Sequence, residues 1–274
     1  MHNDSTIPMV LRVRNGASIS EFRIAAKPEH TVLDVLETLR GRGDEVPSYR
    51  HSCHHGSCGT CGAVINELAS LMCLTSVADL AKPRPRMLGA PPVEPERSED
   101  GALIVSLEPL SGMTVVSGIA VLPGESLSGI PGDWSYLAGV DDDERSALPP
   151  DPADARVDAR ESDSGEPSWR PKGRVRFEAC IECSMCVSVC PVVIPYIGPA
   201  ALAAINRERQ KRPERASLML SVAGEPDGVE PCFRHLACSR VCPQAVYPGK
   251  HIQVLRNVIA ASHAHGETER GRDG

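Results

Sequence analysis

The sequence predicts an α+β protein made of two domains joined by a linker, and three observations support this prediction. Short runs near the start alternate apolar and polar residues around one helical pattern, which indicates strands with a single helix. The final part instead contains runs of good helix formers. Between them lies an acidic, proline-rich stretch, and 274 residues suffice for two domains of ordinary size.

The chain divides by charge into three expected segments: 1–125, a sheet domain; 126–171, a linker or insertion; and 172–274, a helical domain. Residues 111–170 have 4 basic and 12 acidic side chains, whereas residues 171–262 have 12 basic and 7 acidic ones. A segment with so few apolar residues cannot bury enough surface to offset its ordering entropy. The linker is then a solvated acidic loop, or alternatively a docking segment for a basic partner.

The first domain is predicted to begin with a β-hairpin followed by a helix. Met9–Arg14 alternates apolar and polar residues, Asn15-Gly16 is a strong turn signal, and Ser20–Ala25 is the expected return strand. Thr31 caps a helix that ends at Gly41. Its apolar face consists of Val32, Val35, Leu36 and Leu39.

Later elements complete the two domains. Ala102–Leu107 is a further β-rich run in the first domain. In the last domain Pro199 is placed at a helix start, and Pro213 ends that helix. The expected helices cover residues 200–212, 214–223 and 249–263. Loops at the ends of these helices are expected to hold cysteine-rich motifs.

Composition excludes several classes of protein. The net charge of −7 and the pI of about 5.7 argue against a general nucleic-acid binder. The apolar runs are too short for a transmembrane helix, and the opening MHNDSTIPMV has no signal-peptide pattern, so secretion is not expected. An odd count of 11 cysteines does not suit a disulfide framework, which leaves metal or cluster ligation.

The first cysteine group has the spacing of a plant-type [2Fe–2S] site. It comprises Cys53, Cys58, Cys61 and Cys73. Its C-x4-C-x2-C spacing matches that site, and Gly56, Gly59 and Gly62 allow close approach of the backbone to bridging sulfides. A structural zinc site is the alternative, although zinc favours C-x2-C pairs separated by a longer hairpin.

The second and third groups match each other. The second run, Cys180, Cys183, Cys186 and Cys190, has the C-x2-C-x2-C-x3-C-P spacing in which the fourth cysteine ligates the other cluster. The third run comprises Cys232, Cys238 and Cys242. Crossing the ligands predicts a [4Fe–4S] cluster on Cys180, Cys183, Cys186 and Cys242. It leaves Cys190, Cys232 and Cys238 for a cluster with three thiolates, which suits [3Fe–4S].

His235 occupies the second ligand position of the third run. Imidazole can ligate cluster iron, as in Rieske centres, so either a His-ligated [4Fe–4S] cluster or a non-ligating side chain at an open corner is consistent with the sequence. His51, His54 and His55 flank the first group and either tune it or lie on the surface. Met185, within the second run, is expected to pack near the [4Fe–4S] cluster without ligating it.

With this order of motifs the sequence resembles the iron–sulfur subunits of succinate dehydrogenases and fumarate reductases. The short interval from Cys61 to Cys73 resembles the family, as do the segments Leu107–Leu110 and Ile197–Ala200. The resemblance covers roughly 7–125 and 172–262. It implies a β-grasp [2Fe–2S] ferredoxin-like domain followed by a helical bacterial-ferredoxin-like domain.

The resemblance implies an electron-transfer subunit with no catalytic acid or base of its own. Its partners would be an FAD-containing flavoprotein with the dicarboxylate site, membrane anchor subunits, and ubiquinone or menaquinone. The chain would then be peripheral, on the cytoplasmic side of the cell membrane, relaying electrons through [2Fe–2S], [4Fe–4S] and [3Fe–4S] clusters.

Two departures from the family leave the electron acceptor open. The residues after Pro191 are Val192, Val193, Ile194 and Pro195, without tryptophan, and Phe233 replaces a histidine that is frequent in the family. The same set of clusters could instead serve a thiol:fumarate reductase or another flavoprotein dehydrogenase. A free multi-cluster ferredoxin is a further alternative. The basic character of 171–262 would suit anionic lipid, or would balance the acidic linker.

Overall fold

The computed structural model describes residues 5–85, 90–130, 179–192 and 195–270, with side chains described as far as Ser262. Contacts divide the chain into two units, and residues 1–129 and 179–274 together form the first of them. All features below belong to this first unit. Most of the expected linker at 126–171 lies outside the described residues, so its proposed character stays a prediction.

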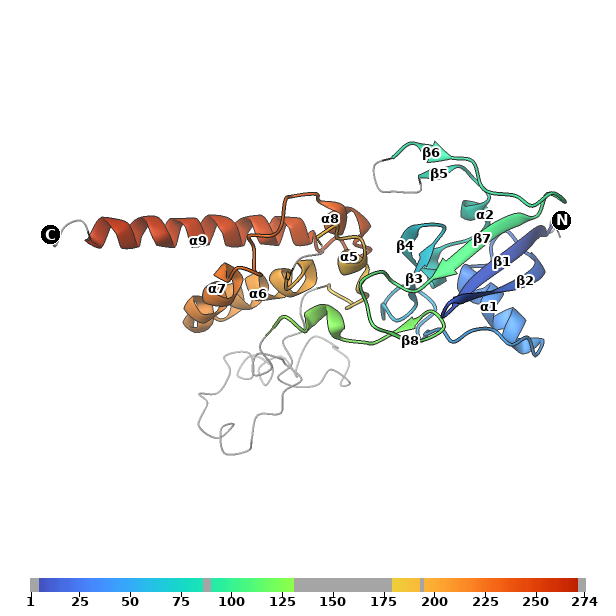
Figure 1. Cartoon of the computed structure of the whole chain (residues 1–274), viewed down its shortest axis with the longest axis horizontal. Coiled ribbons are helices and arrows are strands. Elements are labelled where there is room, and N and C mark those ends of the chain that lie inside the picture. The colour runs from blue at the N-terminus through green and yellow to red at the C-terminus, as the bar shows by residue number, and fades with distance from the viewer. Residues whose placement is uncertain (1–4, 86–89, 131–178, 193–194, 271–274) are drawn as a thin grey trace, which may run out of the picture. The chain divides into compact units, whose positions relative to one another are not determined.

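The N-terminal half is built on a mixed five-stranded sheet with the order β2-β1-β7-β3-β4 (Figure 1). Its strands are β1 (Ile7–Asn15), β2 (Ser18–Ala26), β3 (Gly62–Ile65), β4 (Leu68–Leu71) and β7 (Leu103–Glu108). The central pair β1 and β7 is parallel, whereas β1 with β2, β3 with β7, and β3 with β4 are antiparallel. The predicted hairpin and the β-rich run at 102–107 are thus confirmed.

The smaller elements of this half are short helices and two-stranded ribbons. They are α1 (Val32–Gly41), the 3₁₀ helix η1 (Met72–Leu74), α2 (Val77–Leu80), β5 (Arg84–Pro85), β6 (Pro92–Val93), β8 (Val115–Ser117), β9 (Ala120–Val121) and the 3₁₀ helix η2 (Glu125–Leu127). β5 pairs with β6, and β8 with β9, outside the main sheet.

Helix α1 forms where the sequence predicts it, because Thr31 and Asp34 make a reciprocal cap. The Thr31 hydroxyl accepts from the Asp34 amide at 3.2 Å, and the Asp34 carboxylate accepts from the Thr31 amide at 2.8 Å. The two bonds satisfy amides that the first helical turn leaves unpaired. The apolar face of α1 is fully buried, as expected.

The core lies on one face of the sheet, beneath α1. Alternate residues of β1 (Met9, Leu11 and Val13) join this core, while Val10 lies in a small cluster on the opposite face with Ala102 and Ile104. Successive strand residues point to opposite faces, which explains this division. Met185 from the C-terminal half is also buried in the main core.

The C-terminal half is helical. Its elements are α5 (Met185–Ser188), α6 (Pro199–Lys211), the 3₁₀ helix η4 (Pro213–Arg215), α7 (Ala216–Gly224), α8 (Ala237–Val241) and α9 (Pro248–Arg270). α6 packs against α7 and α9 (Figure 1). Pro199 stands in the first turn of α6, and Pro213 follows its end, as the sequence predicts. Ile252 and Leu255 of α9 are buried.

One expectation about the cysteines is corrected. They were expected in loops, but Cys186 lies in α5 and Cys238 lies in α8. Each short helix begins directly after a left-handed residue, Ser184 or Leu236, which turns the chain into the helix. Helices of four or five residues have too few periodic positions to be recognised from sequence. None of the helices in the described part of the chain is both long and apolar enough to cross a membrane.

Candidate cluster-binding sites

The first cysteine group is brought together by two segments of the N-terminal half. Cys53, Cys58 and Cys61 lie on the loop between α1 and β3, and Cys73 lies in η1 directly after β4. Cys61 and Cys73 are buried, while the other two are partly exposed. The loop therefore has one side in the core and one side near solvent.

Backbone amides in this loop are aimed at a cysteine sulfur. The amides of Ser57 and Cys58 donate to Sγ of Cys53 at 3.3 and 3.4 Å. Hydrogen bonds lower the pKa of Cys53 to about 5: the bond from the Ser57 side chain contributes most, followed by the His55 amide, and the Cys58 amide contributes less. Thiolates are the form that binds iron, so this donor arrangement fits a cluster ligand.

On the buried side of the first group the cysteine pKa is shifted upward, opposite to that of Cys53. Burial, followed by the neighbouring Cys61 thiol, raises the pKa of Cys73 to about 12. Without iron this thiol is neutral near pH 7, and iron binding would release its proton. A close pair of buried cysteines with no disulfide is the donor set that a cluster needs on its protein side.

Two glycines leave room for the loop to fold tightly. Gly56 has φ +79°, and a Cβ there would lie 2.7 Å from Cδ1 of Leu74. Gly59 has φ +71°, and a Cβ there would lie 2.3 Å from the carbonyl oxygen of Ile181. Both positions thus need glycine for backbone angle and for space. Gly62 differs, since it needs only space beside the Cys183 carbonyl.

The second and third cysteine runs share one backbone conformation. In the second run Glu182 and Ser184 have φ of 51° and 61°; in the third run Arg234 and Leu236 have φ of 59° and 60°. These residues are the second and fourth after the first cysteine of each run. Non-glycine residues rarely adopt such angles, so a pattern found twice indicates two copies of one ligand-presenting turn.

His235 therefore occupies the backbone position that Cys183 has in the second run. Its side chain is exposed, and its ring lies edge-on to the exposed Phe233 with centroids 6.5 Å apart. It is absent from the lining of the cavity beside Cys232 and Cys238. This geometry favours the non-ligating interpretation of His235.

The cysteines of the two runs lie close enough to influence one another's pKa values, and this influence crosses between the two predicted ligand sets, since Cys238 as well as Cys242 raises the pKa of Cys186 after burial. Burial is the main cause of the raised pKa values of Cys180, Cys183 and Cys186, and the Cys242 thiol contributes to all three. Burial also dominates the raised pKa values of Cys190 and Cys238, with a contribution from Cys232 to both. The Val246 amide donates to Sγ of Cys242 at 3.3 Å. In the described part of the chain, no three His, Cys, Asp or Glu side chains are arranged around a single metal ion.

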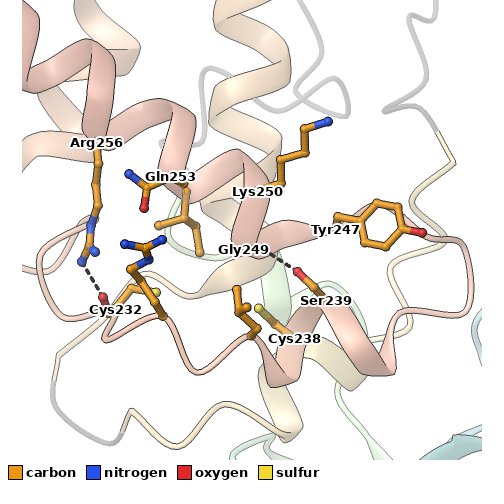
Figure 2. Close-up of a pocket in the computed structure, with 11 residues that line it drawn as sticks. Cys232, Cys238, Ser239, Tyr247, Gly249, Lys250, Gln253 and Arg256 are labelled. Atoms are coloured by element: carbon orange, nitrogen blue, oxygen red, sulfur yellow. Dashed lines mark hydrogen bonds between the residues drawn. The ribbon is translucent and has the colours of Figure 1, made fainter.

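A cavity of about 360 Å³ opens beside Cys232 and Cys238 (Figure 2). Its lining includes the basic residues Arg234, Lys250 and Arg256 and contains no acidic residue. Arg256 donates to the carbonyl oxygens of Val229, Glu230 and Cys232, which fixes the turn that carries Cys232 (Figure 2). A positively charged lining suits the negative charge of a thiolate-ligated cluster.

Three residues near these cysteines were not predicted from the sequence. They are Tyr196, Gln244 and Arg256. Burial, and then the thiols of Cys232 and Cys190, raises the pKa of Tyr196, whose hydroxyl is hydrogen-bonded to the Cys232 side chain. Gln244 could have been noticed, because it follows Cys242 by two residues. Arg256 could not, since no local pattern links α9 to Cys232.

The histidines of the first loop form a small network at the surface. His51 Nδ1 lies 2.9 Å from His54 Nε2, and His51 Nε2 lies 3.3 Å from a Glu37 carboxylate oxygen. The same carboxylate accepts from the Tyr49 hydroxyl at 2.6 Å. His55 bonds the Cys53 carbonyl through its ring. Met185, which the sequence places near the [4Fe–4S] cluster, is buried in the core that α1 and the sheet form.

Comparison with known proteins defines the class of this chain. Residues 10–122 match the model of a 2Fe–2S iron–sulfur cluster binding domain, and residues 176–246 match that of a 4Fe–4S dicluster domain. The Sdh1 complex of Mycobacterium smegmatis in its apo form contains a chain of the same fold, with a TM-score of 0.60 and 20% identity over 94% of this chain and 97% of that one. The protein is therefore an iron–sulfur protein with a ferredoxin-type domain followed by a dicluster domain.

Curated relatives narrow the class further. The chain is 27% identical to the fumarate reductase iron–sulfur subunit of Mycobacterium tuberculosis over 92% of this chain and 90% of the relative. It is 26% identical to the corresponding subunit of Wolinella succinogenes, over 88% and 89% of the two chains. The predicted resemblance to the iron–sulfur subunits of fumarate reductases is thus confirmed over most of the chain.

Proposed function

We propose that this chain relays electrons within a succinate:quinone or quinol:fumarate oxidoreductase, through three clusters that follow one another in space. The observation that carries the proposal is the contiguity of the three cysteine groups. The Gly59 turn of the first group lies against Ile181 and Cys183 of the second. The thiols of Cys238 and Cys242 in turn lie close enough to Cys186 to influence its pKa, after burial.

The proposed ligand sets follow the crossed pairing of the second and third cysteine runs. Cys53, Cys58, Cys61 and Cys73 would hold the [2Fe–2S] cluster. Cys180, Cys183, Cys186 and Cys242 would hold the [4Fe–4S] cluster. Cys190, Cys232 and Cys238 would hold the third cluster. We assign [3Fe–4S] to this third site, since the exposed side chain of His235 leaves three thiolates and no fourth ligand.

The chemistry belongs to the clusters, each of which would carry one electron at a time between a two-electron flavin and the acceptor. The chain supplies ligands, spacing and surroundings. Amides of Ser57 and Cys58 donate to the Cys53 sulfur, and the Val246 amide donates to the Cys242 sulfur, and hydrogen bonds of this kind strengthen when the sulfur is ionised. Cys238 is buried and Cys186 is half-buried, which limits the access of water to the inner faces of the proposed sites.

The proposed partners follow from the relatives, which are subunits of fumarate reductase or belong to a succinate dehydrogenase complex. An FAD-containing flavoprotein would carry the dicarboxylate site, and anchor subunits would hold this chain at the cytoplasmic side of the cell membrane beside a quinone. This chain would contribute no catalytic acid or base. If the complex exists, purification from the native host yields a flavin-containing partner; isolation of a stable monomer with all clusters intact would instead support a free ferredoxin.

A different acceptor is favoured by one observation at the third site. Phe233 is 73% exposed and stands where the family frequently has histidine, and the segment after Pro191 has no tryptophan. A thiol-disulfide acceptor, as in thiol:fumarate reductases, would use the same set of clusters. Assaying the purified complex with quinone analogues and with thiol donors separates the two acceptors.

The ligand sets are tested by a reciprocal pair of variants. Cys190→Ala is expected to remove the third cluster and keep the [4Fe–4S] cluster, whereas Cys186→Ala is expected to do the reverse. Electron paramagnetic resonance (EPR) of the oxidised protein reports the third cluster, because an oxidised [3Fe–4S] centre is paramagnetic and the usual [4Fe–4S]²⁺ is not. Loss of the reduced [4Fe–4S] signal in Cys190→Ala would contradict the crossed assignment.

A further inference from the structure

One side chain links the ligand loop of the second site to the ligand loop of the first. Gln244 follows Cys242 by two residues, and its Nε2 donates to the carbonyl oxygen of Gly56 at 3.2 Å. Gly56 is buried, so its carbonyl requires a hydrogen-bond partner from the protein. The partner comes from the other half of the chain, 188 residues away in sequence.

The Gly56 carbonyl belongs to a peptide group that also contacts a proposed iron ligand. Its other end is the Ser57 amide, which donates to Sγ of Cys53 at 3.3 Å. A continuous path therefore runs from the Gln244 amide through one peptide group to the Cys53 sulfur. A carbonyl that accepts a hydrogen bond polarises its peptide group and strengthens the bond donated by the amide.

Within the first loop, Gly56 has one further polar contact, the hydrogen bond from its amide to Cys73, and this bond does not involve its carbonyl. Gly56 has φ +79°, a left-handed angle from which glycine can readily depart. Leu74, which covers Gly56, contributes only apolar contact and is itself 55% exposed. The bond from Gln244 is thus a directional restraint that fixes how the Ser57 amide points.

We propose that Gln244 is a positioning residue for the first cluster, which orients the Gly56–Ser57 peptide toward Cys53 and thereby raises the reduction potential of that cluster. Hydrogen bonds to cluster sulfurs stabilise the more negative, reduced form and so raise the potential. Since Gln244 belongs to the loop that carries Cys242, the potential of the first site depends on the seating of the second. The inference rests on the proposed ligand sets.

The test replaces the amide by a side chain of similar length without a donor. Gln244→Met is prepared in the full chain within its assembled complex, under anaerobic conditions. Gln210→Met is the matched control, because Gln210 is exposed on α6 and its amide oxygen only accepts from Arg207. Iron and sulfide content, and redox titrations followed by EPR, are measured for both variants.

We expect Gln244→Met to keep its iron and to lower the midpoint potential of the first cluster alone. The loss of one hydrogen-bonded restraint should change the ratio of reduced to oxidised cluster by up to about tenfold, which is about 59 mV for a one-electron couple. The couplings of exchangeable protons to the reduced first cluster should also change. The control should match the wild type.

Other outcomes overturn the inference. An unchanged first-cluster potential at full iron content would show that Gln244 does not act on Cys53. A parallel shift of all clusters would show general loosening. If Gln244→Met assembles poorly, Gln244→Asn replaces it in the test, because asparagine keeps the amide but is one methylene too short to reach Gly56. The inference then requires a lower first-cluster potential in Gln244→Asn, and an unchanged potential overturns it. Absence of the first cluster from the wild-type protein itself would count against the ligand set, which is a separate failure.

Discussion

At the residue scale, a left-handed turn repeated in two places presents the proposed ligand positions of the helical half. Glu182 and Ser184 in one run, and Arg234 and Leu236 in the other, hold the chain in angles that side chains disfavour. Such strain persists only where the surroundings require it, and here each turn presents cysteines. The sequence shows the matched spacing but not the angles, since none of these residues is glycine.

The first prediction concerns the missing ligand of the third run. Because His235 has the backbone position of Cys183, a cysteine there has the geometry to bind a fourth iron. We expect His235→Cys to convert the third cluster from three irons to four and to remove its EPR signal in the oxidised protein. Phe233→Cys is the control, since this exposed position lies outside the repeated pattern.

The outcome of this substitution also tests the wild-type site. If the oxidised wild-type protein has no [3Fe–4S] signal and His235→Cys leaves the iron content unchanged, the wild-type site already contains four irons and His235 is a ligand. If the [3Fe–4S] signal persists in His235→Cys, a thiol at this position does not bind a fourth iron. If Phe233→Cys converts the cluster equally well, the backbone pattern does not decide which residue binds.

The second prediction uses two glycines with the same backbone angle and different surroundings. Gly59 (φ +71°) would place a Cβ 2.3 Å from the Ile181 carbonyl oxygen, whereas Gly112 (φ +72°) has no atom within 4 Å of such a Cβ. Alanine at either position has the left-handed strain of roughly 1–2 kcal/mol. Only Gly59→Ala adds a clash with the second site.

We therefore expect Gly112→Ala to lower the melting temperature slightly and to keep all iron. Gly59→Ala should lower it further and reduce the content of the first cluster. Iron and sulfide analysis together with thermal unfolding measures both effects. Equal behaviour of the two variants would show that the Gly59 loop does not need its close contact with Ile181.

At the element scale, local sequence patterns predicted individual elements, such as the first hairpin and α1, better than they predicted how the remaining strands pair. The Asn15-Gly16 hairpin and α1 follow from turn and capping residues that act within a few positions. The hairpin of β3 and β4 was missed because its turn uses Asn66 and Glu67, both left-handed, in place of the familiar Asn-Gly pair. The parallel pairing of β1 with β7 was also missed, because it joins strands far apart in sequence.

The cysteine positions show the same limit. Spacing alone predicted three groups and the crossed ligand sets, because cluster geometry restricts which intervals are possible. It could not predict Arg256 on α9 holding the Cys232 turn, nor Tyr196 beside the same cysteine. These contacts depend on how helices pack, which no local pattern contains.

The third prediction concerns the contact between α6 and α9. His251 of α9 lies 2.8 Å from the buried Asn206 of α6, and burial, followed by the nearby Arg207, lowers its pKa below the usual 6.5. The unfolded chain, with the ordinary pKa, then binds more protons than the folded chain below about pH 6.5. The free energy of unfolding should therefore decrease as the pH falls from about 6.5 toward the folded-state pKa.

Denaturant titrations at several pH values between 6 and 8 measure this effect. Glutamine in His251→Gln has an amide that can bond Asn206 but cannot be protonated. The difference in the free energy of unfolding between wild type and this variant therefore reports the titration of His251 and not that of other histidines. We expect this difference to change below about pH 6.5 and to stay constant above it. A constant difference over the whole range would show that His251 titrates alike in both states.

At the scale of the whole molecule, the two halves share one core. Met185 of α5 is 2% exposed and packs in the core that α1 and the sheet form, and the Ser111 amide donates to the Ser188 hydroxyl at 2.9 Å. The sequence predicts separate domains at 1–125 and 172–274, because the composition of these two segments differs. In the structure the two halves pack as one unit, because apolar residues of the second run complete the core of the N-terminal half.

The last prediction follows from this shared core. Met185→Ala should destabilise the N-terminal half although Met185 lies in the C-terminal half, and large-to-small changes in a core cost about 2–5 kcal/mol. Met219 of α7 is the matched control, since it is 1% exposed but lies outside the shared core. Visible circular dichroism of the [2Fe–2S] cluster during thermal unfolding reports the N-terminal half. We expect Met185→Ala to lower the temperature at which this signal is lost, and Met219→Ala to affect it much less.

Equal effects of the two substitutions would mean that the whole chain unfolds in one cooperative step. No effect of Met185→Ala would mean that the first site is stable without the second.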